Sequence, residues 1–157
     1  MPLEIERKFL VNDPSFMEKS YKKHFVKQGF LNTDKNRIVR VRILDDKSFL
    51  TIKGVSNSSG TTRFEWEKEI SLQDGKELLL LCENNPIEKE RYLIKNKKYT
   101  FEVDVFLGEN KGLIIAEIEL DAENEKFEKP SWLGAEVTGQ LKYYNSNLSS
   151  TPFKEWG

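Results

Sequence analysis

The chain has 157 residues and carries 25 Lys and Arg against 26 Asp and Glu, which gives a formal net charge of −1. This length predicts one domain over residues 1–157, and the ten Phe, five Tyr and three Trp argue against intrinsic disorder. The balanced charge argues against a broad basic surface for nucleic acid, and one Cys with one His excludes an internal disulfide and a thiolate or imidazole metal site. Any bound metal must therefore have oxygen ligands.

Eight segments are predicted β-strands, because charged and apolar residues alternate along six of them and two further apolar segments lie between these. In chain order the eight are residues 3–11, 25–31, 40–43, 49–53, 63–67, 89–92, 101–105 and 116–120. Residues 14–23 and 72–82 are predicted helices, and residues 130–148 are predicted to contain one or two short ones. Turn signals lie at residues 45–46, 56–60, 84–86, 96–98 and 108–112. This order predicts an α+β fold.

Charged residues share one face on six of these strands. In the opening strand, a period of two places Glu4, Glu6 and Lys8 on one face and apolar residues on the other, with Arg7 as the exception. A charged strand face is usually only a solvated face. Its repetition on six strands, and the preference for Arg over Lys, favour a functional surface, because guanidinium groups suit forked contact with phosphate oxygens.

The charged faces are best explained by an eight-stranded antiparallel β-barrel whose lumen they line. Helices packed outside would then cover the apolar outer face, and the lumen would be a water-filled tunnel. The predicted lining comprises acidic Glu4, Glu6, Glu65, Glu67, Glu102, Asp104, Glu117 and Glu119 and basic Lys8, Arg40, Arg42, Lys53, Arg63, Lys89 and Arg91. Its near balance of charge allows cations on one wall and a polyanion on the other.

This lining predicts metal-assisted phosphoryl transfer. Paired carboxylates are ligands for hard divalent cations such as Mg²⁺, which also bind substrate phosphates, and clustered Arg and Lys bind phosphate oxygens. Catalysis at such sites depends mostly on positioning and charge stabilisation. The chain has no Walker-type glycine loop, so side chains would have to bind the phosphates.

The opening Glu4-x-Glu6-x-Lys8 resembles the ExExK signature of the CYTH domain family, or triphosphate tunnel metalloenzymes, which includes inorganic triphosphatases, thiamine triphosphatases and class IV adenylate cyclases. The signature alone is weak, and the specificity comes from the order of the motifs after it. These are Arg40-x-Arg42, Thr51-Ile52-Lys53-Gly54, Arg63-x-Glu65-x-Glu67, Lys89-x-Arg91-Tyr92, Glu102-x-Asp104, Glu117-x-Glu119 and Glu136-Val137-Thr138 followed by Tyr143 and Asn145. The resemblance runs from Leu3 to about Leu148.

The resemblance implies a tunnel that binds triphosphate with Mg²⁺ or Mn²⁺. By the family pattern, the expected metal ligands are Glu4, Glu6, Glu117 and Glu119. Glu65, Glu67 and Asp104 are expected to serve a second cation or to orient the attacking water, and Lys89 is a further catalytic candidate. The expected phosphate-binding residues are Lys8, Arg40, Arg42, Lys53, Arg63, Lys89 and Arg91.

Two positions depart from the family pattern. Phe30 follows Gln28-Gly29 where relatives often carry Tyr, so the ring is kept and the hydroxyl is lost. Gly139-Gln140 replaces a pair that is more acidic in some relatives.

Three features outside the motifs are expected to be structural. His24 is expected at an exposed helix end, Cys82 on the apolar side of a helix, and the run Leu78-Leu79-Leu80-Leu81 in the core.

The chain is most similar to compact bacterial members that hydrolyse inorganic triphosphate. By strand parity, Phe64, Trp66, Tyr92 and Phe101 are expected to pack under helices, which leaves Phe30 as the ring near the tunnel. We therefore expect a preference for inorganic triphosphate over ATP, because a base pocket needs apolar and aromatic walls. An adenylate cyclase, a thiamine triphosphatase and a non-catalytic polyphosphate-binding module are the alternatives.

The expected partner is a small polyphosphate, and we expect neither nucleic-acid nor membrane binding. No apolar run approaches the roughly 18 residues that span a bilayer, and the first residues lack the pattern of a signal peptide. These observations predict a cytoplasmic protein. Monomer and homodimer both remain open.

Overall fold

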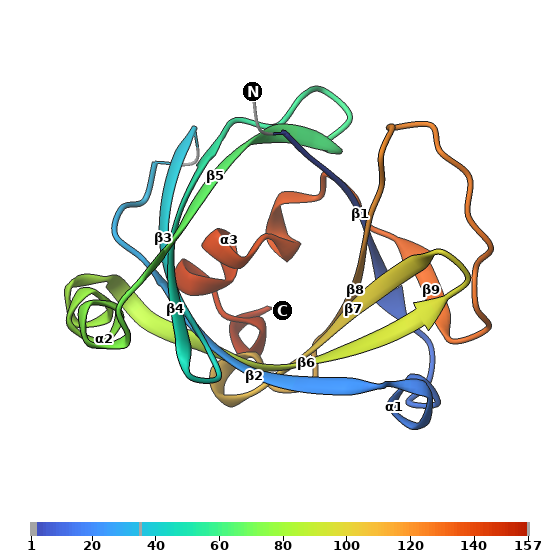
Figure 1. Ribbon diagram of the computed structural model, residues 1–157, viewed down its shortest axis with the longest axis horizontal. Helices are drawn as coiled ribbons and strands as arrows, with labels where there is room; N and C mark the ends of the chain where they lie inside the picture. The colour runs from blue at the N-terminus through green and yellow to red at the C-terminus, as the bar shows by residue number, and fades with distance from the viewer. Residues whose placement is uncertain (1–2, 35, 157) are drawn as a thin grey trace.

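The computed structural model describes residues 3–34 and 36–156, and its strands form a closed antiparallel barrel (Figure 1). The strand order is β5-β4-β3-β2-β6-β7-β8-β1-β9, and pairing of β5 with β1 closes the ring. The strands are β1 (Leu3–Val11), β2 (Lys22–Phe30), β3 (Arg37–Leu44), β4 (Lys47–Gly54), β5 (Thr62–Ile70), β6 (Glu83–Asn96), β7 (Tyr99–Phe106), β8 (Ile114–Glu119) and β9 (Leu133–Glu136). The predicted eight-stranded barrel is confirmed, and β9 is an addition outside the ring.

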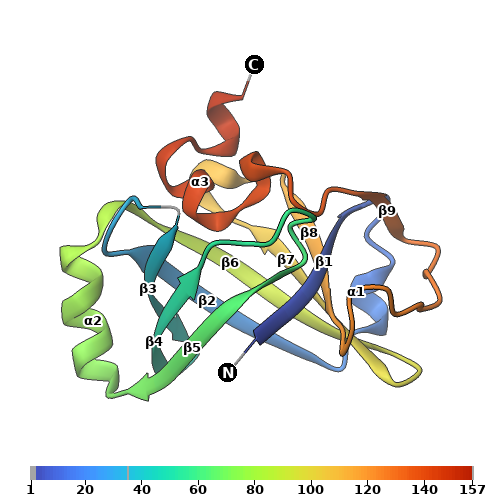
Figure 2. The same ribbon diagram turned by 90° about the horizontal axis from the view of Figure 1, so that it is seen from above.

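Short helices complete the fold: α1 (Phe16–Lys19), α2 (Leu72–Leu81) and α3 (Asn145–Ser150), with 3₁₀ turns at 108–110, 141–143 and 153–155. Helices α1 and α2 pack outside the barrel, as predicted. Helix α3 differs, because it lies across one end of the barrel and is seen inside the ring of strands in Figure 1 and above them in Figure 2. No helix in the described part of the chain is long and apolar enough to cross a membrane.

The start of β2 shows where the predicted helix over residues 14–23 is wrong. Only Phe16–Lys19 is helical, because β2 begins at Lys22, which pairs with Leu93 of β6. His24 therefore lies on a strand and not at a helix end, and its Nδ1 contacts the carboxylate of Asp45. Pairing with a neighbouring strand outweighs a local helix signal here.

The predicted turn at residues 84–86 is also wrong, because these residues belong to β6. The register of β2 against β6 shifts between Gln28 and Phe30, and Asn84 has a positive φ of 62°. The turn-type residues therefore accompany an irregularity in the strand pairing.

Two apolar clusters form the core: the first lies on the outer side of the barrel, and the second lies at the end of the barrel that α3 covers, where Phe30 and Ile38 also border the lumen. In the first, Phe16 of α1 contacts Tyr92 and Trp132, with ring centroids 5.6 and 5.8 Å apart. In the second, Leu148 of α3 packs beside Phe106 and Tyr143. The strand faces that point outward are therefore covered where a helix or a loop crosses them.

Other outward faces stay uncovered, contrary to two expectations. Trp66 on β5 is 39% exposed, because no helix crosses that strand. In α2, Leu79 is buried, whereas Leu80 and Leu81 are 86% and 71% exposed. Consecutive residues of a helix point about 100° apart, so four successive Leu cannot all face the barrel.

Candidate active site

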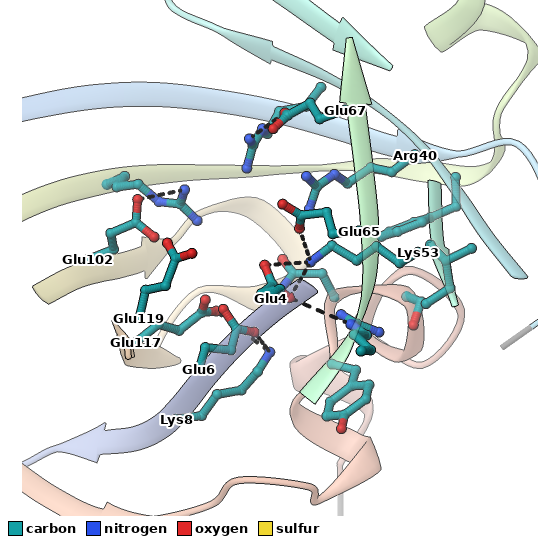
Figure 3. Close-up of a pocket in the computed structure, with 18 of the residues that line it drawn as sticks. Glu4, Glu6, Lys8, Arg40, Lys53, Glu65, Glu67, Glu102, Glu117 and Glu119 are labelled. Atoms are coloured by element: carbon teal, nitrogen blue, oxygen red, sulfur yellow. Dashed lines mark hydrogen bonds and ion pairs between the residues drawn. The ribbon is translucent and has the colours of Figure 1, made fainter. Parts of the chain in front are cut away.

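The lumen holds a cavity of about 230 Å³ (Figure 3). Of the fifteen predicted lining residues, all but Asp104 border it, from strands β1 and β3 to β8. The cavity-lining residues are Glu4, Glu6, Lys8, Phe30, Ile38, Arg40, Arg42, Lys53, Arg63, Glu65, Glu67, Lys89, Arg91, Glu102, Glu117, Glu119, Tyr144, Asn145 and Ser146. The period-two alternation of the strands brings residues from distant parts of the chain to one charged space.

Carboxylates gather where β1 lies beside β8. In the strand register, Glu6 is opposite Glu119 and Lys8 is opposite Glu117. The Lys8 Nζ lies 3.8 Å from Glu6 and 3.6 Å from Glu117. Burial and the charges of Glu117 and Glu4 raise the pKa of Glu6 well above 4.5. Glu6 is therefore the weaker acid of the carboxyl groups on this wall.

Glu117 has the opposite shift. Burial opposes the ionisation of Glu117. The positive charges of Lys8, Arg91 and Lys89 and a hydrogen bond from Glu6 outweigh this effect and keep the pKa of Glu117 well below 4.5. Neighbouring carboxyl groups whose pKa values are driven apart in this way are crowded, and a cation bound between them would relieve that crowding.

Glu4 lies next to two cations. The Lys53 Nζ is 3.1 Å from Glu4 Oε1, and the Arg63 Nε is 3.6 Å from the same oxygen. Burial disfavours the carboxylate of Glu4. The positive charges of Lys53 and Arg63, together with a hydrogen bond to Glu65, nevertheless lower its pKa to about 2. Lys53 also lies 3.1 Å from Glu65, so it joins the wall of β1 to that of β5.

Arg40 and Arg42 on β3 are only partly satisfied by protein partners. Arg40 donates to the Thr51 hydroxyl at 3.2 Å, and Arg42 donates to Glu67 at 3.0 Å. The Nε of each guanidinium is buried and has no hydrogen-bond partner among the described residues. Burial and the charge of Arg42 lower the pKa of Arg40 to about 9. These groups are suited to an anion that enters the cavity.

Asp104, predicted to be catalytic, lies behind the lining and is 1% exposed. Its carboxylate accepts two hydrogen bonds from Arg91, at 2.8 and 3.0 Å, and lies 2.8 Å from the Lys89 Nζ. The geometry therefore does not support direct contact with water or a metal. Asp104 instead holds two cavity-lining cations in place.

The C-terminal segment supplies lining residues that strand alternation did not reveal. The Tyr144 ring centre lies 4.9 Å from the Lys8 Nζ and 5.4 Å from the Arg63 Cζ. Asn145, which belongs to the tail motif, contacts Lys89, whereas Tyr143 of that motif is buried in the second core cluster against Trp156. No strand periodicity marks this segment, so only its docking on the barrel identifies the lining residues.

The donor set of the lumen fits a hard divalent cation. Glu4, Glu6, Glu117 and Glu119 come from adjacent strands, although within residues 3–34 and 36–156 no group of three such side chains forms a ready-made metal site. Cations such as Mg²⁺ bind through one or two carboxylates and take the remaining oxygens from water and phosphate. The feature of this site that fits such a cation best is the pairing of β1 with β8, which places Glu6 opposite Glu119 and beside Glu117.

Comparisons with known proteins agree with this geometry. An inorganic triphosphatase of Acetivibrio thermocellus is 48% identical over 99% of both chains, and one of Nitrosomonas europaea is 34% identical over 93% of this chain and 96% of its own. The crystal structure of the inorganic triphosphatase NE1496 superposes with a TM-score of 0.67 at 33% identity, covering 93% of this chain and 97% of that one. The CYTH domain model matches residues 2–151, so the chain belongs to the CYTH domain family.

Proposed function

We propose that this protein is a metal-dependent triphosphatase whose preferred substrate is inorganic triphosphate. The observation that carries the proposal is the charged cavity, in which seven cationic side chains and seven carboxyl groups face one another inside a closed barrel. Charge interactions with a phosphate chain are stronger inside a protein cavity than in bulk water. Relatives of this chain that are 48% and 34% identical are inorganic triphosphatases, which supports the same reaction here.

In this proposal the basic residues bind the phosphate oxygens. The free Nε groups of Arg40 and Arg42 donate to one phosphate, and Lys8, Lys53 and Arg63 exchange part of their carboxylate contacts for phosphate contacts. Arg91 contributes from the opposite wall, where Asp104 fixes its guanidinium. Binding at several points holds the triphosphate extended and aligns one of its anhydride bonds for hydrolysis.

The metal ligands of the proposal are Glu4, Glu6, Glu117 and Glu119, and the cation is Mg²⁺ or Mn²⁺. When bound, such a cation neutralises phosphate charge and polarises the phosphoryl group. Glu65 and Glu67 on β5 border the same cavity and serve to orient the attacking water. Lys89 donates from its ammonium to the leaving phosphate oxygen and stabilises the charge that develops there.

The preference for inorganic triphosphate follows from the walls of the tunnel. Phe101 is buried in the outer core and Tyr92 packs against it, while Trp66 faces solvent, so these rings are not available to a base. The Tyr144 ring does border the lumen, but Lys8 and Arg63 occupy its faces. We expect kcat/KM for inorganic triphosphate to exceed that for ATP by at least about tenfold.

One observation favours an organic triphosphate as a second candidate. A cavity of about 380 Å³ adjoins the lumen and shares Ile38, Arg63, Tyr144 and Ser146 with it. Val55 and Leu141 make part of its wall apolar, which suits an organic group better than the lumen does. A thiamine triphosphatase or an adenylate cyclase would use this neighbouring cavity for the thiamine or the adenosine.

Product analysis separates these candidates. The protein is incubated with inorganic triphosphate, thiamine triphosphate and ATP in turn, with Mg²⁺ or Mn²⁺, and phosphate, pyrophosphate and cyclic nucleotide are measured. Rapid release of phosphate from inorganic triphosphate supports the proposal. A kcat/KM for ATP or thiamine triphosphate equal to or above that for inorganic triphosphate would favour the second candidate. Binding without any product would identify a polyphosphate-binding module.

A further inference from the structure

The ammonium group of Lys89 has an incomplete set of protein partners at the edge of the lumen. Lys89 is 1% exposed, and its Nζ contacts Asp104 Oδ2 at 2.8 Å and Asn145 Oδ1 at 3.0 Å. A lysine ammonium has three N–H donors, so two are used by the protein and one remains for a ligand. The direction of that third donor depends on both protein contacts.

The second contact comes from outside the ring of strands. Asn145 is the first residue of α3, which lies across the end of the barrel in Figures 1 and 2. Buried packing of Leu148 and Tyr143 fixes this segment on the barrel. An element remote from β6 in the sequence therefore provides half of the support of a lysine on β6.

The amide of Asn145 is itself held in one orientation. Its Oδ1 also accepts a hydrogen bond at 2.9 Å from the Nε2 of Gln28, a fully buried residue of β2. Lys89 can only donate, so an oxygen must face it, and the Gln28 contact favours the same orientation. Gln28, Asn145 and Lys89 thus form a connected chain of hydrogen bonds that ends at the lumen.

We infer that Asn145 is a positioning residue that fixes the Lys89 ammonium for hydrolysis, an inference that rests on the proposed triphosphatase function. Asp104 alone does not define the direction of Lys89, because a single contact leaves the ammonium free to rotate about it. Arg91 provides a contrast, since Asp104 accepts two hydrogen bonds from it and, in the described part of the chain, α3 forms no hydrogen bond with it. Loss of Asn145 should therefore misplace Lys89 and leave Arg91 unchanged.

The first test compares Asn145→Ala with Asn147→Ala. Asn147 is an exposed residue of the same helix whose side chain forms no hydrogen bond with the described residues. We expect Asn145→Ala to lower kcat about tenfold to a hundredfold, which is the usual effect of one charge-assisted contact, and to change KM less than about threefold. Asn147→Ala should behave like the wild type. A wild-type kcat in Asn145→Ala would overturn the inference.

The second test distinguishes positioning from support of α3. Asn145→Asp keeps an oxygen for Lys89 but places a negative charge near the phosphates, so kcat should recover relative to Asn145→Ala while KM rises. If Asn145 only holds α3 in place, both variants should lower the melting temperature and neither should split kcat from KM. That result would overturn the inference.

A double-mutant cycle measures whether Asn145 acts through Lys89. In the background of Lys89→Gln, whose amide can still donate to Asp104, Asn145→Ala should cause no further loss of kcat. The cycle with Gln28→Leu, which keeps Lys89 and a measurable rate, should likewise be non-additive. Additive losses in either cycle would overturn the inference. A wild-type protein without triphosphatase activity would instead refute the proposed function, so the two failures are distinguishable.

Discussion

Some charged side chains in the lumen lack the partners that a purely stabilising role would require. Arg40 shows this well, because it is buried, has a pKa lowered to about 9, and leaves its Nε without a partner among the described residues. A protein that used this guanidinium for stability would satisfy its donors. Lys53 differs from Arg40, because its ammonium is paired with the carboxylate of Glu4. The proposed phosphate-binding residues are therefore not equivalent to one another.

Arg40→Ala should weaken triphosphate binding without destabilising the fold. Loss of one charge-assisted contact should raise KM by about one to two decades. The melting temperature should be unchanged or higher, because the substitution removes a buried charge close to Arg42. The matched control is Arg37→Ala on the same strand, whose exposed side chain pairs with Asp34 outside the lumen. Unfolded Arg40→Ala protein would show instead that the arginine is structural.

Glu4→Gln should remove most of the activity and keep the fold. An amide oxygen is a much poorer ligand for a hard cation, and Lys53 retains Glu65 as a partner in the variant. The measurement is the rate as a function of Mg²⁺ or Mn²⁺ concentration, with the melting temperature recorded in parallel. Glu18→Gln on the exposed helix α1 is the control. Full activity in Glu4→Gln, or in excess chelator, would contradict the metal site.

Deprotonation of Lys89 should reduce the activity at alkaline pH. Burial lowers its pKa to about 8, with Asp104 opposing the shift and Arg91 adding to it. The free enzyme therefore loses this proton as the pH rises through about 8, and kcat/KM should fall there. Lys89→Arg should move the fall to higher pH, because guanidinium keeps its proton. An unchanged pH profile in Lys89→Arg would assign the fall to another group.

The lowered pKa of Lys89 also makes the stability of the fold depend on pH. Above a pH of about 8 the folded protein has released the Lys89 proton, whereas the unfolded chain retains it up to the ordinary lysine pKa of 10.5. The unfolded state then binds more protons, so the contribution of Lys89 to the free energy of unfolding increases with pH across that range.

At the scale of elements, helices attach to the barrel through small contact regions. Helix α2 begins at Ser71, whose side chain accepts a hydrogen bond from the Asp74 amide, and it packs on β3 and β4. Gly75 permits the close approach, because a Cβ at this position would lie 1.7 Å from the Ser48 Oγ. The helix therefore depends on a missing side chain as much as on apolar burial.

Gly75→Ala should destabilise the protein although Ala is the better helix former. The steric conflict with Ser48 should cost about 1–3 kcal/mol, which exceeds the gain of about 1 kcal/mol in helix propensity. Urea unfolding measures the difference, and the exposed Lys76→Ala in the same helix should change stability by less than about 0.5 kcal/mol. Folded Gly75→Ala should keep the wild-type kcat, because α2 does not border the lumen. Increased stability would show that Ser48 moves aside freely.

At the scale of the whole molecule, balanced charge lets the barrel fold around a polar lumen. The seven cations and seven carboxyl groups that line the cavity neutralise one another, and several are in direct ion pairs. A triphosphate brings several negative charges into this balance. A divalent cation that enters with it would offset part of that charge, which gives a physical reason to expect metal dependence.

Ligand binding should therefore raise the melting temperature most when both components are present. Triphosphate at about 100 times its Kd should add about 2.7 kcal/mol to the free energy of unfolding. We expect the thermal shift to be larger with Mg²⁺ and triphosphate together than with either alone, and larger than in Arg40→Ala. A shift from triphosphate that does not depend on the cation would contradict this account.

The sequence by itself determined the barrel and most of the lumen, because a strand's two-residue period is a local property. Alternation along six segments assigned thirteen of the predicted lining residues that border the cavity, and Lys53 on an intervening segment is the fourteenth. It could not show that Asp104 lies behind Lys89 and Arg91, since residues of equal parity differ in depth according to their partners. Family motifs pointed to roles for these residues that the geometry does not test.

Only the tertiary structure decided which segment covers one end of the barrel and which of its residues line the lumen. Tyr144 and Asn145 reach the lumen because Leu148 and Tyr143 are buried against the barrel, and no periodicity within residues 130–148 predicts that docking. Long-range pairing also turned the predicted helix end at His24 into a strand. The way α2 docks left Leu80 and Leu81 in solvent. Local patterns define which residues share a face, whereas packing between distant elements determines what each face meets.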